Sequence, residues 1–532
     1  MFTFSLILTI ILWFTYTGKS IANINLTVDL GYSVYQGVDE GNFIAHWLGI
    51  RYAAPPLGDL RFRGPKDPVV DETLHIADTK AYICKHGGIC LSSPSSSLDS
   101  RYTEDCLFLD VYAPTRNTRG PKPVFVWFQG GGFNSLANPN QSGSNLIQNG
   151  DYGIVFVTFN YRVGLYGFLA SQEVQENGNV NAGLLDQRKV LEWVQKYIHL
   201  FGGDPSHVTI GGASAGAASV TLHLSAYGGR DDGLFHAAVA ESQSFGAQLT
   251  VSESQYQYDA LVQRVGCDTV PDTLQCLRDL DVDVLAQYNS NIPTPGGAGS
   301  PPLFMYSNVI DGDFTVDYTY KLYSEGKFVK VPVIFGDDTN EGTMFAPKTT
   351  SNYQQMNSFL KNNFVKLTPA QLATIDTLYP PAETFPNSGP YWRTASNAYG
   401  EMRYNCPGIY LSSTYPSHGV PQSWNYHYDY ATPANALSGL GVYHTSENSL
   451  LWGDATNPLG IVFQMYWISF IRSKDPNTYK LPSAPEWTTF DGVTMGRILF
   501  PDDPMGVKME MVPVDQQTRC VYLSSIGAGV GQ

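Results

Sequence analysis

The chain has 532 residues, of which 43% are hydrophobic and only 15% charged, as is typical of a globular protein. Its formal net charge of −16 at pH 7 argues against nucleic acid as a partner, because phosphate contacts require a basic surface. Strand-like and helix-like segments alternate through most of the chain, and no Pro-, Gly- or Ser-rich linker divides it. We therefore expect a single α/β domain over residues 23–532, with long helical insertions.

The first residues predict a secretory signal peptide. Residues 5–16 form an apolar core, and Ser20-Ile21-Ala22 offers small residues at the two positions that define a cleavage site. The apolar run is shorter than the ~20 residues that a membrane span requires, so an uncleaved anchor is the weaker alternative. We expect residues 1–22 to be removed and the protein to be secreted, without a stable membrane anchor.

Two glycosylation sequons suit this extracellular route. The first is Asn25-Leu26-Thr27 and the second is Asn140-Gln141-Ser142. A sequon is an acceptor site for N-linked glycans in secreted proteins. We therefore expect glycosylation at Asn25 and Asn140.

The chain has seven cysteines, and most of them should pair in an oxidising compartment. Cys267 and Cys276 close a short loop and are expected to form one disulfide. Cys106 is expected to pair with Cys90, with Cys84 as the alternative. An odd count leaves at least one free thiol or one intermolecular bond, and the partners of the other cysteines stay open.

Apolar or alternating runs predict the strands of a sheet. These runs cover residues 124–128, 154–159, 208–210, 237–240, 331–335, 424–430 and 493–500. Helical spacing of apolar residues predicts helices at 184–198 and 459–473, and residues 254–290 and 353–415 read as helical insertions. Buried strands that alternate with helices predict a mostly parallel central sheet covered by helices on both faces.

One pentapeptide carries the strongest chemical signal. Gly212-Ala213-Ser214-Ala215-Gly216 follows the strand at 208–210 and precedes a segment that reads as a helix. A Gly-x-Ser-x-Gly sequence at a strand-to-helix turn is typical of a nucleophile elbow, which lifts the serine hydroxyl out of the sheet edge. Ser214 is therefore a candidate nucleophile, and Ala215 begins the helix that aims its amide groups at the reacting centre.

A serine hydroxyl is a weak nucleophile and needs a histidine as base, which in turn needs a carboxylate to orient it. The loop after the strand at 331–335 offers Asp337, Asp338 and Glu341, and the residues alone do not separate these three. Among the later histidines, His418 and His444 both lie in loops, and their spacing favours His444, whereas His427 lies within a strand.

Motifs along almost the whole mature chain resemble the type-B carboxylesterase/lipase family, closest to its secreted fungal esterases. They include Glu104-Asp105-Cys106-Leu107, Gly130-Gly131-Gly132-Phe133, Asp186-Gln187-Arg188, Phe201-Gly202-Gly203-Asp204-Pro205 and the elbow itself. The resemblance implies an α/β-hydrolase fold and a triad of Ser214, Glu341 and His444. One departure from the family pattern is Ala213, since the residue before the serine is usually glutamate.

The resemblance also implies an oxyanion hole. The amides of Gly131, Gly132 and Ala215 are expected to stabilise the negative charge that ester cleavage places on the carbonyl oxygen. Glycines directly after a strand allow this close approach because they have no Cβ.

The implied activity is that of a secreted serine carboxylesterase acting on small ester molecules through an acyl-enzyme. A lipase or sterol esterase of the same family is the alternative. Lipases of the family carry a long amphipathic lid in the first disulfide loop, whereas residues 91–100 here are short and polar. A non-catalytic, cholinesterase-like binding protein is the alternative from another class, and it usually lacks a triad member.

No metal and no cofactor are predicted. The chain contains no His-Glu-x-x-His sequence and no paired Cys-x-x-Cys sequences. Its triple glycine does not extend to the Gly-x-Gly-x-x-Gly pattern of dinucleotide binding. No oligomeric state is predicted from the residues.

Overall fold

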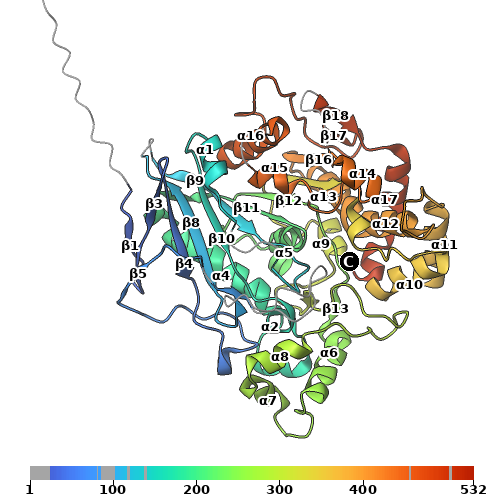
Figure 1. Ribbon diagram of the computed structural model, residues 1–532, viewed down its shortest axis with the longest axis horizontal. Coiled ribbons are helices and arrows are strands. Elements are labelled where there is room, and N and C mark those ends of the chain that lie inside the picture. The colour runs from blue at the N-terminus through green and yellow to red at the C-terminus, as the bar shows by residue number, and fades with distance from the viewer. Residues whose placement is uncertain are drawn as a thin grey trace, which may run out of the picture.

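A sheet of eleven strands lies at the centre of the computed structural model (Figure 1). The structure describes residues 24–80, 82–84, 102–116, 120–136, 141–453, 457–501 and 506–532. The predicted signal peptide, Asn140 and Cys90 lie outside these ranges. Among the described residues, no helix is both long and apolar enough to cross a membrane.

The order of the strands across the sheet confirms the predicted architecture. From one edge to the other the strands are β18 (Lys508–Met511), β17 (Gly496–Pro501), β16 (Ser423–Asp429), β15 (Val333–Asp338), β12 (Ala237–Glu241), β11 (Gly203–Ala213), β9 (Lys122–Phe128), β10 (Val155–Phe159), β8 (Phe108–Pro114), β4 (Ile44–Arg51) and β3 (Val38–Gly41). The strands from β17 to β10 pair in parallel, and antiparallel strands flank them at both edges. Each of the seven predicted strand runs falls on one of these parallel strands.

The remaining strands form small sheets away from the centre. They are β1 (Thr27–Asp29), β2 (Val34–Gln36), β5 (Leu74–Ile76), β6 (Ile83–Cys84), β7 (Tyr102–Thr103), β13 (Leu249–Thr250) and β14 (Val309–Ile310). The first three of them form one sheet near the N-terminal side of the molecule (Figure 1).

The helices connect the strands and cover the sheet. They are α1 (Ser144–Asn149), α2 (Gly164–Phe168), α3 (Gln172–Asn177), α4 (Ala182–Tyr197), α5 (Ala215–Gly229), α6 (Val251–Arg264), α7 (Thr273–Asp279), α8 (Val282–Tyr288), α9 (Thr319–Ser324), α10 (Tyr353–Asn363), α11 (Pro369–Leu378), α12 (Trp392–Gly400), α13 (Cys406–Ser417), α14 (Pro433–Ser438), α15 (Asn448–Trp452), α16 (Pro458–Ser473) and α17 (Val514–Gly527). A π-helical turn, Glu401–Asn405, joins α12 to α13.

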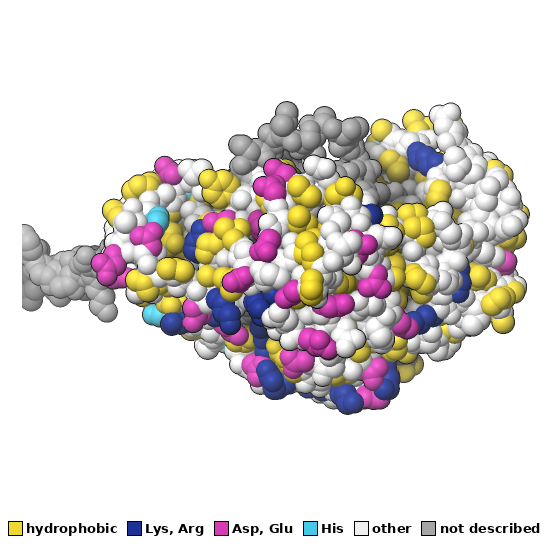
Figure 2. Space-filling view, turned by 90° about the horizontal axis from the view of Figure 1, so that it is seen from below, with side chains coloured by type: hydrophobic (Ala, Val, Ile, Leu, Met, Phe, Trp, Pro, Cys, Tyr) yellow, Lys and Arg dark blue, Asp and Glu magenta, His cyan; other side chains and the backbone are white. Residues whose placement is uncertain are grey.

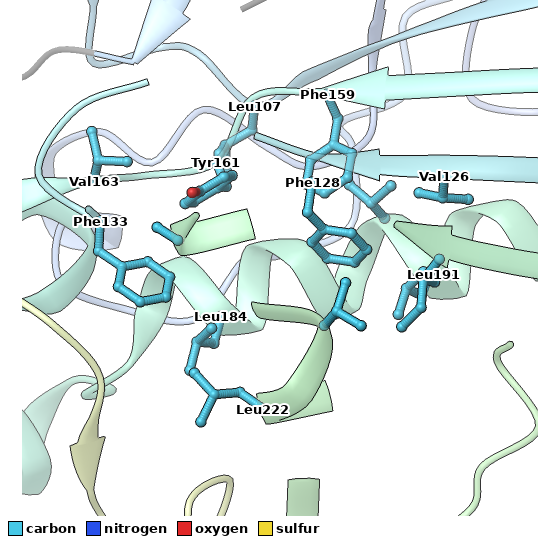
Figure 3. Close-up of a cluster of buried hydrophobic side chains, with 14 of the residues drawn as sticks. Leu107, Val126, Phe128, Phe133, Phe159, Tyr161, Val163, Leu184, Leu191 and Leu222 are labelled. Atoms are coloured by element: carbon cyan, nitrogen blue, oxygen red, sulfur yellow. The ribbon is translucent and has the colours of Figure 1, made fainter. Parts of the chain in front are cut away.

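Alternation along β9 explains why both faces of the sheet are covered. Val126 and Phe128 belong to one buried cluster, whereas Phe125 and Trp127 belong to another. Successive side chains of a strand point to opposite faces, so an uninterrupted apolar run requires packing on both. Apolar residues of α4, α5 and α13 cover the first face, and those of α1, α15 and α16 cover the second. Figure 3 shows part of the first cluster, where the Phe128 and Phe159 rings meet edge to face.

Three disulfides lie among the described residues. Cys267 bonds to Cys276, as expected, and a third bond joins Cys406 of α13 to Cys520 of α17. The expected bond between Cys106 and Cys90 is corrected, because Cys106 bonds to Cys84. The parallel pairing of β6 with β7 brings the Cα atoms of Cys84 and Cys106 to 4.8 Å, a separation that a disulfide spans.

The acidic excess is not gathered into one patch on the face drawn in Figure 2. Acidic side chains are interspersed there with basic and apolar ones. A mixed surface with a large net charge favours solubility.

Candidate active site

Ser214 lies at the turn between β11 and α5, as the elbow motif predicts. Its backbone has φ 61° and ψ −121°, a conformation that L-residues rarely adopt and that typically costs ~1–3 kcal/mol. The turn requires glycine on both sides of the serine. A Cβ on Gly216 would lie 2.1 Å from the carbonyl oxygen of Phe128, and one on Gly212 would lie 2.6 Å from the backbone of Gly216. The first turn of the helix therefore packs directly against the end of β9.

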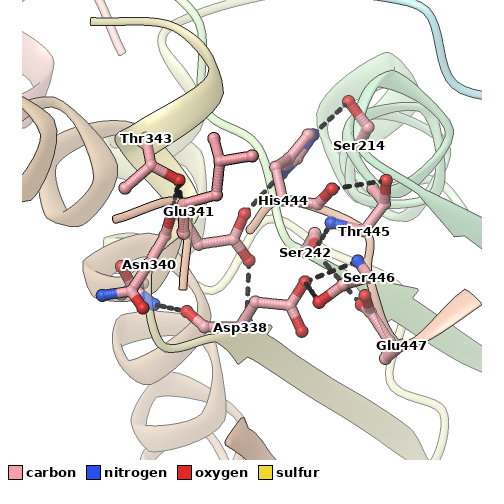
Figure 4. Close-up of polar contacts among 12 residues, drawn as sticks. Ser214, Ser242, Asp338, Asn340, Glu341, Thr343, His444, Thr445, Ser446 and Glu447 are labelled. Carbon is pink, nitrogen blue, oxygen red and sulfur yellow. Dashed lines mark hydrogen bonds and ion pairs between the residues drawn. The ribbon is translucent and has the colours of Figure 1, made fainter. Parts of the chain in front are cut away.

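His444 reaches Ser214 from a loop between α14 and α15. Its Nε2 lies 2.7 Å from the Ser214 Oγ, and the ring is buried (Figure 4). The next residue fixes the loop, because the backbone amide of Thr445 donates to the Ser242 hydroxyl at 3.1 Å. The imidazole is thus held against the serine from a part of the chain 230 residues away.

Glu341 contacts the other ring nitrogen of His444. Its carboxylate accepts from Nδ1 through Oε2 and from the backbone amide of Asp338 at 2.8 Å through Oε1. The bond at Nδ1 leaves Nε2 free to accept the serine proton. Asn340 links the acid loop to the histidine loop, since its amide donates to the Val442 carbonyl at 2.8 Å and its side chain accepts from the Val442 amide at 3.0 Å.

The other residues that the sequence offered as the base or the acid make different contacts. His418 bonds to the Thr414 carbonyl, and His427 pairs with Glu510 at 2.8 Å. Asp337 and Asp338 form no hydrogen bond to His444 among the described residues. The structure thus brings Ser214, His444 and Glu341 together, an arrangement able to activate a hydroxyl for attack on a carbonyl.

The glycine loop after β9 runs beside the nucleophile. A Cβ on Gly130 would lie 3.1 Å from the Ser214 Cβ. Gly131 and Gly132 have φ values of 115° and 62°, and a Cβ on either would collide with Ser135 or with the ring of Phe304. Ala215 is the first residue of α5, so its amide belongs to the free N-terminus of a helix. Gly130 and Ala215 therefore adjoin the serine, and Gly131 and Gly132 continue the same loop.

Aromatic side chains line the histidine. The Tyr404 ring lies 4.3 Å from the His444 ring and the Phe345 ring 5.1 Å from it, measured between centroids. Tyr404 belongs to the π-helical turn, and Phe345 follows Glu341 by four residues. The sequence motifs assign Tyr404 no role at this site. Its place at the site depends on the extra residue of a π-turn, a feature that often marks functional sites and has no sequence signal here.

A cluster of buried carboxyl groups lies behind the histidine loop, and sequence reasoning gave it no role. Glu447 accepts from Ser242 at 3.1 Å and from Tyr426 at 2.9 Å, and Asp338 accepts from the Ser446 amide at 2.8 Å (Figure 4). Burial, together with the neighbouring carboxylates, raises the pKa of Asp338 well above its ordinary value. The pKa values of Glu241, Asp337 and Glu447 are raised in the same way.

One group of potential metal ligands lies close together among the described residues, and it consists of Glu401, Cys406 and Cys520. The two cysteines are joined in a disulfide and therefore offer no thiolate. Glu401 accepts two hydrogen bonds from Arg519, at 2.7 Å each. This group therefore links the π-helical turn and α13 to α17.

The sheet order, the elbow and the Ser–His–Glu contacts define an α/β-hydrolase. The model of the carboxylesterase family matches residues 31–510, and the chain belongs to that family. The protein is a carboxylic ester hydrolase.

The comparisons with individual proteins agree with this assignment. The chain resembles the crystal structure of Aspergillus niger EstA with a TM-score of 0.90 and 39% identity, covering 96% of this chain and 99% of that one. It is 30% identical to secreted lipase 4 of Gibberella zeae, over 87% of this chain and 85% of that protein. It is also 32% identical to lipase 2 of Geotrichum candidum, over 84% and 86% respectively.

Proposed function

We propose that the protein is a secreted serine carboxylesterase that forms an acyl-enzyme on Ser214, with His444 as the base and Glu341 as the orienting acid. The observation that carries this proposal is the chain of contacts from Ser214 Oγ through His444 to Glu341, with 2.7 Å between Oγ and Nε2. Secretion is supported by the apolar N-terminal segment and by relatives that are named secreted lipases. Glycosylation at Asn25 and Asn140 is part of the same proposal.

In the first half of the reaction, Ser214 Oγ attacks the ester carbonyl while His444 Nε2 takes its proton. The amides of Gly131, Gly132 and Ala215 stabilise the oxyanion, and each such donor typically contributes roughly 3–4 kcal/mol in the transition state. His444 then gives the proton to the departing alcohol, which leaves the acyl group on Ser214. Glu341 holds the imidazole in the required tautomer and stabilises its charged form.

In the second half, His444 accepts a proton from water as the water attacks the acyl-enzyme. The same amides stabilise the second oxyanion, and His444 returns the proton to Ser214 as the acid is released. The residues of the two halves are the same, so no further group of the chain is required.

A lipase is the second candidate, because several relatives are named lipases. The polar character of residues 91–100 favours soluble, shorter-chain esters over lipid droplets. That segment lies outside the described residues.

The test is hydrolysis of a p-nitrophenyl ester series from acetate to palmitate, with the wild type, Ser214→Ala and the control Ser206→Ala. Ser206 is an exposed serine that hydrogen-bonds to Asp204. We expect activity to peak at short chains, to fall by at least ~10³-fold in Ser214→Ala and to persist in the control. A peak at long chains above the solubility limit of the substrate would identify a lipase. Equal activity in both variants would contradict the role of Ser214.

A further inference from the structure

Arg403 is a buried cation without a counter-ion. It lies in the π-helical turn and is only 7% exposed, and among the described residues no carboxylate lies within 4.0 Å of its guanidinium. Its Nε has no hydrogen-bond acceptor there. Two other buried arginines are paired with acids, since Arg61 contacts Glu104 at 2.6 Å and Arg162 contacts Asp186 at 2.6 Å. Arg278 has no carboxylate partner among the described residues, but its guanidinium donates to backbone carbonyls. An unpaired buried charge is costly, so its retention calls for an explanation.

The groups around Arg403 do not neutralise it. Its guanidinium carbon lies 4.9 Å from the centre of the Phe304 ring and 5.7 Å from that of Tyr404. Tyr399 and Tyr404 also lie near the guanidinium, and the Tyr399 hydroxyl has no hydrogen-bond partner among the described residues. Burial raises the pKa of both tyrosines. Both tyrosines therefore stay neutral, and the guanidinium stays positively charged. Aromatic faces attract a cation but supply no anionic acceptor for its N–H groups.

The same residues connect Arg403 to the reacting centre. Phe304, which stacks near the guanidinium, also covers the oxyanion glycine Gly132, where an added Cβ would lie 2.1 Å from its ring. Tyr404, the neighbour of Arg403 in the chain, contacts the His444 ring. The guanidinium thus lies one aromatic side chain away from the oxyanion loop and one away from the proposed base.

Two small cavities adjoin the guanidinium. One measures about 40 Å³ and is lined by Phe304 and Arg403, and the other measures about 20 Å³ and is lined by Phe133, Ala218 and Arg403. Ala218 is one helical turn beyond Ser214, whose carbonyl accepts from its amide at 2.9 Å. Each cavity has room for at least one small polar group. Arg403 therefore borders both cavities, and it shares one of them with Phe304, whose ring covers Gly132.

We propose that Arg403 binds a carboxylate carried by the ester substrate, so that the enzyme prefers esters with an anionic substituent a few bonds from the scissile carbonyl. This inference rests on the proposed serine esterase function. A guanidinium presents parallel N–H groups that match a carboxylate, and the pair is strongest where water is scarce. A substrate carboxylate would supply the counter-ion that the fold omits. It could belong to the acyl part or to the alcohol part, and both share the same recognition chemistry.

Two isosteric substrate pairs test the proposal and locate the carboxylate. On the acyl side, monoethyl succinate is compared with ethyl 4-methylpentanoate, in which an isopropyl group replaces the carboxylate. On the alcohol side, 3-acetoxypropanoate is compared with isopentyl acetate in the same way. The readout is the anionic-to-neutral ratio of kcat/KM within each variant, measured by pH-stat titration. Because it is a ratio, a general loss of activity cancels.

The variants are Arg403→Met, which removes the charge, and Arg403→Lys, which keeps the charge but lacks the parallel N–H groups of the guanidinium. Arg472→Met is the matched control, since Arg472 packs on Tyr479 and donates to the Gly150 carbonyl at 3.3 Å, in the layer of α16. In one of the two pairs we expect the ratio to fall at least tenfold in Arg403→Met, to fall less in Arg403→Lys and to stay unchanged in the control. If Arg403→Met fails to fold, the fall in Arg403→Lys decides.

Unchanged ratios in both pairs would overturn the proposal, and so would a wild type that hydrolyses neither anionic ester. These results are separate from a failure of the proposed function. Ser214-dependent hydrolysis of the neutral esters would leave the serine esterase intact while the role of Arg403 fails. A wild type that is inactive on neutral esters as well would instead contradict the proposed function.

Discussion

At the scale of single residues, the sequence alone predicts the nucleophile but not every residue around it. Ser214 follows from its motif and from the strand and helix beside it. Glu341 does not, because three acids share its loop and only the family resemblance separates them. The structure supplies the reason: Glu341 has turned into the 3₁₀ helix after β15, whereas Asp338 still belongs to the strand and faces Glu447. Such differences in direction are set by backbone geometry and not by residue type.

Asp338 ties the acid loop to the histidine loop, and its protonation should couple stability to pH. Its raised pKa means that the folded protein keeps the proton and the unfolded chain releases it above about pH 4. The native state then binds more protons, so stability falls as pH rises from about 4 towards the raised pKa, by up to about 1.4 kcal/mol per pH unit. The neutral carboxyl donates to Glu447 and also faces Glu341 and Tyr428.

Asp338→Asn imitates the protonated carboxyl, since an amide can donate to Glu447 and accept from Ser446. We expect the thermal midpoint of this variant to decline less between pH 5 and pH 8.5 than that of the wild type. The residual decline belongs to the other buried carboxyls of the cluster. Glu486→Gln, at an exposed carboxylate, should follow the wild type. A decline equally steep in Asp338→Asn would show that the proton resides elsewhere in the cluster.

At the scale of elements, the parallel strands are predictable and the edge strands are not. Strand β12 is buried throughout and β9 at all but one position, and their continuous apolar runs are distinctive. Strands β3 and β18 lie at the edges and are largely exposed, so their sequences lack the pattern. The π-helical turn that carries Arg403 and Tyr404 also has no sequence signal. The contact of Tyr404 with the His444 ring is therefore not predictable from the sequence.

The contact between α5 and β9 gives a prediction at this scale. Gly216→Ala places a methyl group 2.1 Å from the Phe128 carbonyl oxygen, at the end of β9. Overpacking of a rigid backbone contact typically costs ~1–3 kcal/mol, so we expect a lower thermal midpoint together with a loss of esterase activity. Gly529→Ala adds the same methyl group where no atom lies within 4 Å and should change neither. Wild-type behaviour of Gly216→Ala would refute the close packing of the elbow on β9.

At the scale of the whole molecule, segments far apart in the sequence converge on one face of the sheet through α13. Helices α10 to α12 and α17 form a third buried cluster beside the sheet, joined to it through α13 (Figure 1). The sequence indicated helical insertions over 353–415 but not their partner, because nothing local in α17 specifies that it packs on α13. The disulfide between Cys406 and Cys520 joins α13 to α17 across 114 residues of the chain.

This disulfide should stabilise the protein more than the local one does. In the loop-entropy account, a bond that closes 114 residues contributes about 5 kcal/mol and one that closes 9 residues about 2.6 kcal/mol. We expect the double variant Cys406→Ser with Cys520→Ser to lower the urea midpoint roughly twice as far as Cys267→Ser with Cys276→Ser.

The two bonds should also differ in their effect on activity. Cys406 directly follows the π-helical turn, so loosening α13 frees Tyr404 from the His444 ring, and esterase activity should fall with stability. The loop between Cys267 and Cys276 links α6 to α7 and contains none of the residues placed at the site. Equal losses of activity in both double variants would mean that packing between α13 and α17 is sufficient, without the disulfide, to keep Tyr404 against the His444 ring.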